Sequence, residues 1–143
     1  IVAVNAMGEV VDPDTGRIIA GVRSPEGGYL STMKLLRQGL RQGRAGPENT
    51  TIGVVATNAV LSKEEANRLA LTAHDGLAWA IRPVHTMGDG DTLFTLSYPG
   101  DGSLRADMTT LGALACDVVA RAIVNAVLNA QSLFGIPAAR DWR

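Results

Sequence analysis

Cysteine, aromatic residues and charge of one sign are all scarce in this sequence. A single cysteine, Cys116, excludes an internal disulfide and is typical of a reducing compartment, so we expect a cytoplasmic protein. Aromatic residues make up 4% of the chain, and the net charge is −1 without a basic block. We therefore expect no partnership with nucleic acid or with an anionic membrane surface.

Long apolar runs and targeting segments are also missing from the pattern. No apolar stretch approaches the roughly 20 residues that span a bilayer, and no signal peptide is visible. The chain opens on a strand-like segment, residues 1–5, without an initiator methionine. We therefore expect a processed or truncated piece whose sheet neighbours lie on residues outside this sequence.

What is present is the composition of one globular α/β domain. The 143 residues are 46% hydrophobic and 19% charged, which suits a single core of small aliphatic side chains. The expected elements are a strand over 1–11 with a possible bend at Gly8, a turn at 12–16, a returning strand over 17–22, a short helix over 29–40, a buried strand over 52–57, a helix over 62–82, a strand over 92–98 and a helix over 107–134.

Specific residues mark the ends of the two long helices. Ser62 and Glu65 have the spacing of a capping box, and Asp107 is a suitable N-cap for the last helix. Pro83 ends the first long helix because a residue before proline is pushed out of the α region. Gly135 is the expected stop of the last helix.

The junction between a loop and the strand over 52–57 carries the main functional hypothesis. A segment over 42–48, which we expect to be exposed and suited to processing, leads into Asn49-Thr50-Thr51. If the Asn49–Thr50 bond is cut, Thr50 gains a free α-amine, whose pKa of about 7.7–8.0 suits a base, next to its own hydroxyl. The alternatives are that both threonines simply begin a strand, or that Thr51 is the nucleophile.

Three further polar residues are candidates for the site. Asn5 lies in an apolar strand pattern, where its amide either donates to an oxyanion or is a satisfied structural group. Asp89 and Asp91 share one face at a strand entrance and either orient the threonine, bind a hard cation such as Mg²⁺, or are solvated turn residues.

The two histidines and the cysteine give no catalytic pattern of their own. His74 and His85 lack metal-ligand spacing, so a structural role is expected for each, although His85 is close enough in sequence to the aspartates to contact them. Cys116 is expected to be a small buried apolar residue.

Taken together, three motifs resemble one known family. They are residues 48–59, residues 82–86 and residues 88–94, or ENTTIGVVATNA, RPVHT and GDGDTLF. These segments resemble the L-aminopeptidase/D-amidase-esterase family of self-processing N-terminal-nucleophile hydrolases, and within it the nylon oligomer hydrolases. The resemblance covers nearly the whole chain and is most specific at the Asn-Thr-Thr junction.

The resemblance implies a fold and a division of the chain. The implied fold is a four-layer α/β/β/α sandwich, of which this chain covers a part. Residues 1–49 would end an α subunit and residues 50–143 would form the β subunit. Cleavage between Asn49 and Thr50 would make Thr50 the nucleophile, assisted by Asn5, Asp89 and Asp91. No cofactor or metal is implied, and the expected partners are the rest of the α subunit and further α/β units in a homo-oligomer.

The resemblance also implies a substrate, and other functions remain open beside it. The favoured interpretation is hydrolysis of internal amide bonds in 6-aminohexanoate (nylon-6) oligomers. The alternatives are an aminopeptidase or D-amino-acid amidase-esterase of the same family, or a non-catalytic module that binds a divalent metal or serves in assembly.

Overall fold

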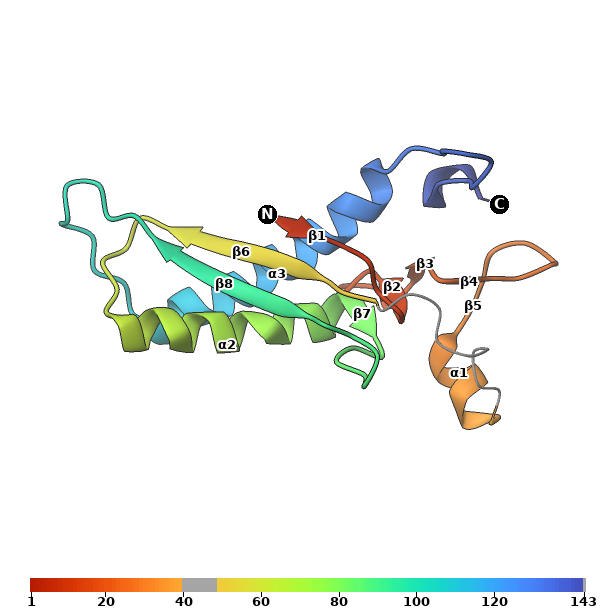
Figure 1. Ribbon diagram of the computed structural model, residues 1–143, viewed down its shortest axis with the longest axis horizontal. Coiled ribbons are helices and arrows are strands. Elements are labelled where there is room, and N and C mark those ends of the chain that lie inside the picture. Colours follow the sequence, from red (N-terminus) through yellow and green to blue (C-terminus); the bar gives the residue numbers. More distant parts are fainter. Residues whose placement is uncertain (40–48, 143) are drawn as a thin grey trace.

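Two long helices and a three-stranded sheet form the body of the protein (Figure 1). The computed structural model describes residues 1–39 and 49–142, so the processing segment expected over 42–48 lies outside the described residues. The elements are β1 (Val2–Ala3), β2 (Glu9–Val11), β3 (Ile18–Ala20), β4 (Val22–Arg23), β5 (Tyr29–Leu30), α1 (Thr32–Arg37), β6 (Ile52–Thr57), α2 (Lys63–Ala80), β7 (Ile81–Arg82), β8 (Thr92–Ser97), α3 (Met108–Asn129) and the 3₁₀ turn η1 (Ala139–Asp141).

The central sheet has the strand order β1-β6-β8 and joins both halves of the chain. β6 runs parallel to β8 with Ile52 opposite Thr92 and Thr57 opposite Ser97. β1 pairs antiparallel with β6, with Val2 opposite Gly53. Since α2 connects the two parallel strands, β6-α2-β8 is a crossover unit, and it brings the starts of β6 and β8 to the same edge of the sheet.

The expected strand over 1–11 is in fact two strands in different sheets, so that part of the prediction is wrong. β1 joins the central sheet, whereas β2 pairs with β3 and β7 in a second sheet of order β3-β2-β7. The expected bend at Gly8 has a steric reason, because a Cβ on Gly8 would lie 2.2 Å from the carbonyl oxygen of Pro83. The predicted turn over 12–16 does join β2 to β3.

The two long helices begin where the sequence predicts, but the bounds of α1 and the end of α3 differ from the prediction. Ser62 and Glu65 make both hydrogen bonds of the capping box, and Asp107 caps α3 by accepting from the N–H of Thr110 at 2.8 Å. α1 is shorter than the predicted 29–40, because Tyr29–Leu30 form β5 instead. α3 ends at Asn129 rather than near Phe134, so the predicted length was wrong there too.

The core lies between one face of the central sheet and the two long helices. Its fully buried side chains include Leu69, Leu77 and Ile123, and α2 approaches α3 so closely at Gly76 that a Cβ there would lie 2.4 Å from the carbonyl oxygen of Cys116. The opposite face of the sheet is exposed, so β6 is half-buried rather than buried as predicted. The large apolar side chains of this exposed sheet face are Ile52, Val54, Phe94 and Leu96.

Helix α3 qualifies the expectation that no segment is long and apolar enough to span a membrane. It has 22 residues, and an 18-residue stretch within it has a mean hydropathy of 1.8, which meets that criterion by length and composition. One such helix is weak evidence, since the core helix of a soluble protein passes the same test. Here Val119 and Ile123 are buried in the core, which accounts for the apolar composition of one side of α3.

Candidate functional site

The Asn49–Thr50 peptide lies at the edge of the central sheet where β6 and β8 begin. Asn49 pairs with the loop before β8 as an isolated parallel bridge to Asp89. Its N–H donates to the carbonyl of Gly88 at 3.2 Å, and its carbonyl accepts from the N–H of Gly90 at 2.9 Å. Backbone hydrogen bonds on both sides therefore fix the peptide that is expected to be cut.

Thr50 places its hydroxyl directly against that peptide. Its Oγ1 donates to the carbonyl oxygen of Asn49 at 2.7 Å, and its N–H donates to the carbonyl of Asn5 at 2.9 Å. Gly90 packs against the same side chain, because a Cβ on Gly90 would lie 2.9 Å from Thr50 Oγ1. The nucleophile candidate, the carbonyl and a backbone donor thus meet at one point.

Thr51, the rival nucleophile, is oriented differently. Its side chain is fully buried, and its Oγ1 has no hydrogen-bond partner among the described residues. Successive side chains of an extended chain point to opposite sides, so Thr51 faces the core when Thr50 faces the junction. The geometry therefore favours Thr50 over Thr51 for attack on the Asn49 carbonyl.

The two aspartates predicted to work as a pair have different contacts. Asp91 has a side chain that is only 4% exposed, and its Oδ1 accepts from the N–H of Thr51 at 2.9 Å. Asp89 instead accepts from the N–H and the hydroxyl of Thr86, at 3.0 and 2.6 Å. Asp91 thus holds the backbone next to the nucleophile, whereas Asp89 stabilises the turn between Thr86 and itself in the loop before β8.

The alternative of a cation site at these aspartates gains no support from the described part of the chain. In residues 1–39 and 49–142, no group of three or more His, Cys, Asp or Glu side chains is arranged to hold a metal ion. Each described hydrogen bond to Asp89 and Asp91 comes from an N–H or O–H donor instead.

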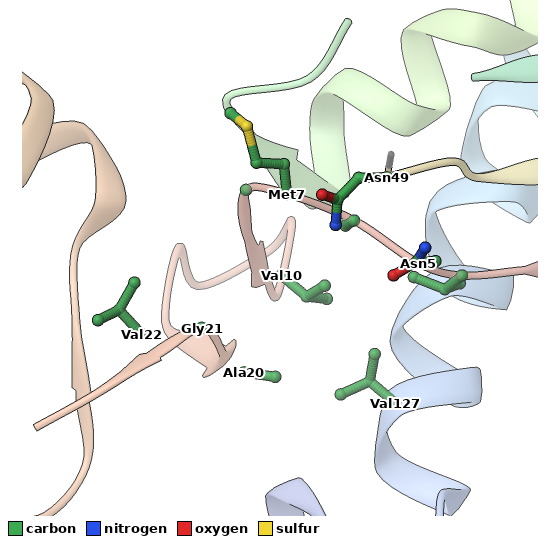
Figure 2. A pocket seen from close by; sticks show the side chains of 11 residues that line it. Asn5, Met7, Val10, Ala20, Gly21, Val22, Asn49 and Val127 are labelled. Atoms are coloured by element: carbon green, nitrogen blue, oxygen red, sulfur yellow. The ribbon is translucent and has the colours of Figure 1, made fainter. Parts of the chain in front are cut away.

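Asn5 lies after the end of β1 and is exposed, so its placement in a continuous apolar strand was wrong. It nevertheless reaches the site, since its backbone carbonyl binds Thr50 and its side chain lines a hollow of about 500 Å³ together with Asn49. Figure 2 shows the two amides of Asn5 and Asn49 among the side chains that line this hollow, which also include Val10 and Val127. The hollow therefore combines aliphatic side chains, exposed backbone polar groups and two side-chain amides next to the junction.

The sequence of this chain matches one protein family along nearly its whole length. The family model described as Peptidase family S58 covers residues 2–140. This chain belongs to peptidase family S58. The family membership expected from the three sequence motifs is thereby confirmed.

Curated relatives of this S58 chain carry two kinds of name. An uncharacterized aminopeptidase of Mycobacterium tuberculosis is 41% identical over 160 residues, covering 99% of this chain and 46% of the relative. An uncharacterized aminopeptidase of Mycobacterium leprae is 40% identical over 156 residues, covering 96% and 42%. The 6-aminohexanoate-oligomer endohydrolase of Paenarthrobacter ureafaciens is 38% identical over 88 residues, covering 54% and 25%. The chain spans less than half the length of these relatives.

The relatives differ in how well they support the two activities expected from the sequence, nylon oligomer hydrolysis and aminopeptidase activity. The matches to proteins named aminopeptidases extend over nearly the whole S58 chain, whereas the match to the endohydrolase extends over about half of it. The aminopeptidase alternative is therefore better supported than the favoured interpretation as a nylon oligomer hydrolase.

The histidines of the S58 chain are part of the site, which the sequence indicated only for His85. His85 Nδ1 lies 3.0 Å from Asp91 Oδ2, and His85 Nε2 lies 3.3 Å from Nδ1 of His74 on α2. Burial, followed by the charge of His85, lowers the pKa of His74 below its ordinary value, while Asp91 and Asp75 oppose that shift. No local sequence signal could have revealed the contact between His74 and His85, because it joins α2 to the loop before β8.

Cys116 is confirmed as a buried residue. Its thiol donates to the carbonyl of Thr72 at 3.1 Å, and burial raises its pKa. The thiolate form that attacks carbonyl groups is therefore disfavoured at neutral pH.

Proposed function

We propose that this chain carries the self-processing junction of an aminopeptidase-type amide hydrolase, in which cleavage between Asn49 and Thr50 creates the nucleophile. One observation carries the proposal: the hydroxyl of Thr50 lies against the Asn49 carbonyl, whose oxygen also accepts from the N–H of Gly90. A hydroxyl, the amide that it would attack and a donor for the developing charge are thus in place together.

The self-processing step uses these three groups. Thr50 Oγ1 bonds to the carbonyl carbon of Asn49, and the negative charge that forms on the carbonyl oxygen is stabilised by the Gly90 N–H. The bond from that carbon to the Thr50 nitrogen then breaks as the nitrogen takes up the proton that the hydroxyl has lost, which leaves an ester between Asn49 and Thr50 Oγ1. Water hydrolyses the ester, releasing the Asn49 carboxylate and a free Thr50 α-amine and hydroxyl.

In the hydrolysis of substrates, the same residue works a second time. The α-amine, whose ordinary pKa is about 7.7–8.0, takes the proton of the hydroxyl as Oγ1 attacks the substrate amide, and it passes that proton to the leaving amine as the C–N bond breaks. Water then hydrolyses the ester on Thr50 and releases the acyl group as a carboxylate. Asn5, whose side chain lines the hollow beside the junction, is suited to donate to the substrate oxyanion. Asp91 holds the N–H of Thr51 and so fixes the backbone next to the nucleophile.

The substrate class follows from the hollow and the relatives. A hollow lined by aliphatic side chains, polar backbone groups and two amides, with no charged side chain among its described lining residues, suits a small, weakly charged amide, and the relatives that match nearly the whole chain are named uncharacterized aminopeptidases. We therefore place short peptides and amino-acid amides first. The 6-aminohexanoate oligomers come second, supported by the partial match to the endohydrolase.

The rest of the protein would complete the fold. The exposed sheet face formed by Ile52, Val54, Phe94 and Leu96 is suited to pack against a second sheet, as a four-layer sandwich with residues 1–49 in the α subunit and 50–143 in the β subunit requires. Assembly into homo-oligomers and a cytoplasmic location remain predictions.

The test compares two neighbouring substitutions in the full-length protein. Thr50→Ala should abolish both the appearance of a fragment that begins at Thr50 and all amide hydrolysis. Thr51→Val is the matched control, since it keeps the shape of a buried side chain whose hydroxyl has no described partner, and it should still be cut. Intact mass, N-terminal sequencing and rates on amino-acid amides, dipeptides and 6-aminohexanoate oligomers give the readout. Cleavage and full activity in Thr50→Ala would overturn the proposal.

A further inference from the structure

A continuous line of hydrogen bonds leads from α2 to the residue beside the nucleophile. The N–H of Leu93 lies 3.3 Å from His74 Nε2, His74 Nδ1 lies 3.3 Å from His85 Nε2, and His85 Nδ1 lies 3.0 Å from Asp91 Oδ2. The other oxygen of Asp91 accepts from the N–H of Thr51 at 2.9 Å. These contacts join α2, the loop before β8 and the start of β6.

The line fixes which ring nitrogen carries each proton. A backbone N–H only donates, so His74 Nε2 must accept from Leu93, and a neutral His74 then carries its proton on Nδ1. That proton is donated to His85 Nε2, which leaves the proton of His85 on Nδ1, facing the carboxylate of Asp91. With both imidazoles neutral, each group in the line has a matching partner.

We propose that His85, supported by His74, is a positioning residue that aims the Asp91 carboxylate at the backbone N–H of Thr51 and so sets the geometry of Thr50. This inference rests on the proposed self-processing at Thr50 and extends it to residues of α2 and the loop before β8. His85 touches neither Thr50 nor the Asn49 carbonyl in the described contacts, and it acts through Asp91.

The backbone of His85 strengthens the argument. Its φ is +55°, in the left-handed region that most side chains avoid, and its own N–H also lies 3.3 Å from Asp91 Oδ2. Asp91 therefore receives both a backbone and a side-chain donor from a residue held in an uncommon conformation. Strain of this kind persists where the surrounding contacts define it.

Because of this positive φ, His85 can be replaced by two residues that keep its backbone conformation and differ only in their side chain. Glycine and asparagine both tolerate positive φ, so neither His85→Gly nor His85→Asn forces the backbone to change. The asparagine amide can replace the Nδ1 donor to Asp91 but has no counterpart of Nε2, while glycine supplies neither. Phe134, at φ +50° and exposed, is the other non-glycine residue with positive φ in the described chain, so Phe134→Gly controls for the added glycine.

The experiment measures how fast the full-length protein cuts itself after cell-free synthesis, by following the fragment that begins at Thr50 on denaturing gels. We expect His85→Gly to slow cutting about tenfold or more, as loss of a hydrogen bond to a charged group does. His85→Asn should recover most of that loss, and Phe134→Gly should cut at the wild-type rate. Wild-type cutting by His85→Gly, or equal slowing in His85→Asn and His85→Gly, would overturn the inference.

A pH profile separates positioning from a general loss of folding. A second proton on His74 goes to Nε2, where the ring N–H and the backbone N–H of Leu93 are then two donors facing each other, so the wild-type rate should fall on the acid side. Asp91 on the loop, Asp75 on α2 and His85 itself are the charged or titratable groups that act on His74. In His85→Asn this acid limb should shift or disappear while the rate at higher pH is retained, and an unchanged limb would count against the inference. If instead the wild-type protein is never cut at Asn49–Thr50, the proposed function itself fails.

Discussion

The backbone N–H of Gly90 donates to the carbonyl oxygen of Asn49 at 2.9 Å. The two residues lie on different segments, one before β6 and one before β8, and the parallel pairing of these strands brings them together. The contact gives the scissile carbonyl a donor that does not have to move during the reaction, which is the property that makes backbone N–H groups effective for oxyanions.

Replacement of Gly90 by alanine should slow self-processing. The added Cβ would lie 2.9 Å from Thr50 Oγ1, closer than side chains pack, so the hydroxyl must turn away from the carbonyl that it attacks. Gly88→Ala is the matched control, because a Cβ there meets nothing within 4 Å. We expect the fraction of cut chain, measured by intact mass over time, to lag in Gly90→Ala alone. Equal rates in both variants would show that the packing of Gly90 on Thr50 is immaterial.

Replacement of Asn5 by alanine should separate the two reactions of Thr50. The contact that Asn5 makes with the N–H of Thr50 uses its backbone carbonyl, which alanine retains, so self-processing should continue. Hydrolysis should lose a side-chain donor from the substrate hollow, and kcat should fall about a hundredfold, the usual effect of removing one oxyanion donor. The measurement is kcat on an amino-acid amide, using protein already shown by mass to be cut. A parallel fall in both reactions would contradict this division of roles.

Replacement of Asp91 by asparagine should cost more stability than the same change at Asp89. Both oxygens of Asp91 accept hydrogen bonds, so an NH₂ group at either position meets a donor of Thr51 or His85 in a buried setting. Leaving such groups unpaired costs about 1–3 kcal/mol. Asp89 uses only Oδ2 in the described contacts, so Asp89→Asn can turn its amide away from Thr86. Urea denaturation of the two variants gives the comparison, and equal losses would contradict it.

Local sequence signals predicted where the helices begin better than they predicted which face of a helix packs into the core. The capping box of Ser62 and Glu65 and the N-cap Asp107 are contacts within one turn of helix, so their residue types suffice to predict them. The packed face of α3 was not predicted in the same way. The apolar period of this helix favours Leu114 and Val118 for the core, yet they are 56% and 57% exposed, while the small residues Gly112 and Ala120 are buried instead.

The difference at α3 comes from how closely the two long helices approach. Gly76 on α2 lies against the backbone of Cys116, so small residues occupy the contact and larger ones are displaced to the outside. Apolar periodicity alone does not report such a distance. The same limit applies to the site: spacing indicated Thr50 and Asp91, but the tertiary path that brings His74 to His85 is not encoded in any local pattern.

Replacement of His74 by glutamine should flatten the pH dependence of stability on the acid side of neutrality. Burial lowers the pKa of His74 in the folded protein below its ordinary value of 6.5, so the unfolded chain binds this proton first as the pH falls. The contribution of His74 to the free energy of unfolding is therefore complete above pH 6.5 and is lost progressively below it. Glutamine does not titrate and can still accept from the N–H of Leu93, so urea midpoints of His74→Gln should fall less between about pH 7.5 and 5.5 than those of wild type. Parallel curves for the two proteins would show that His74 is protonated equally easily in the folded and unfolded chains.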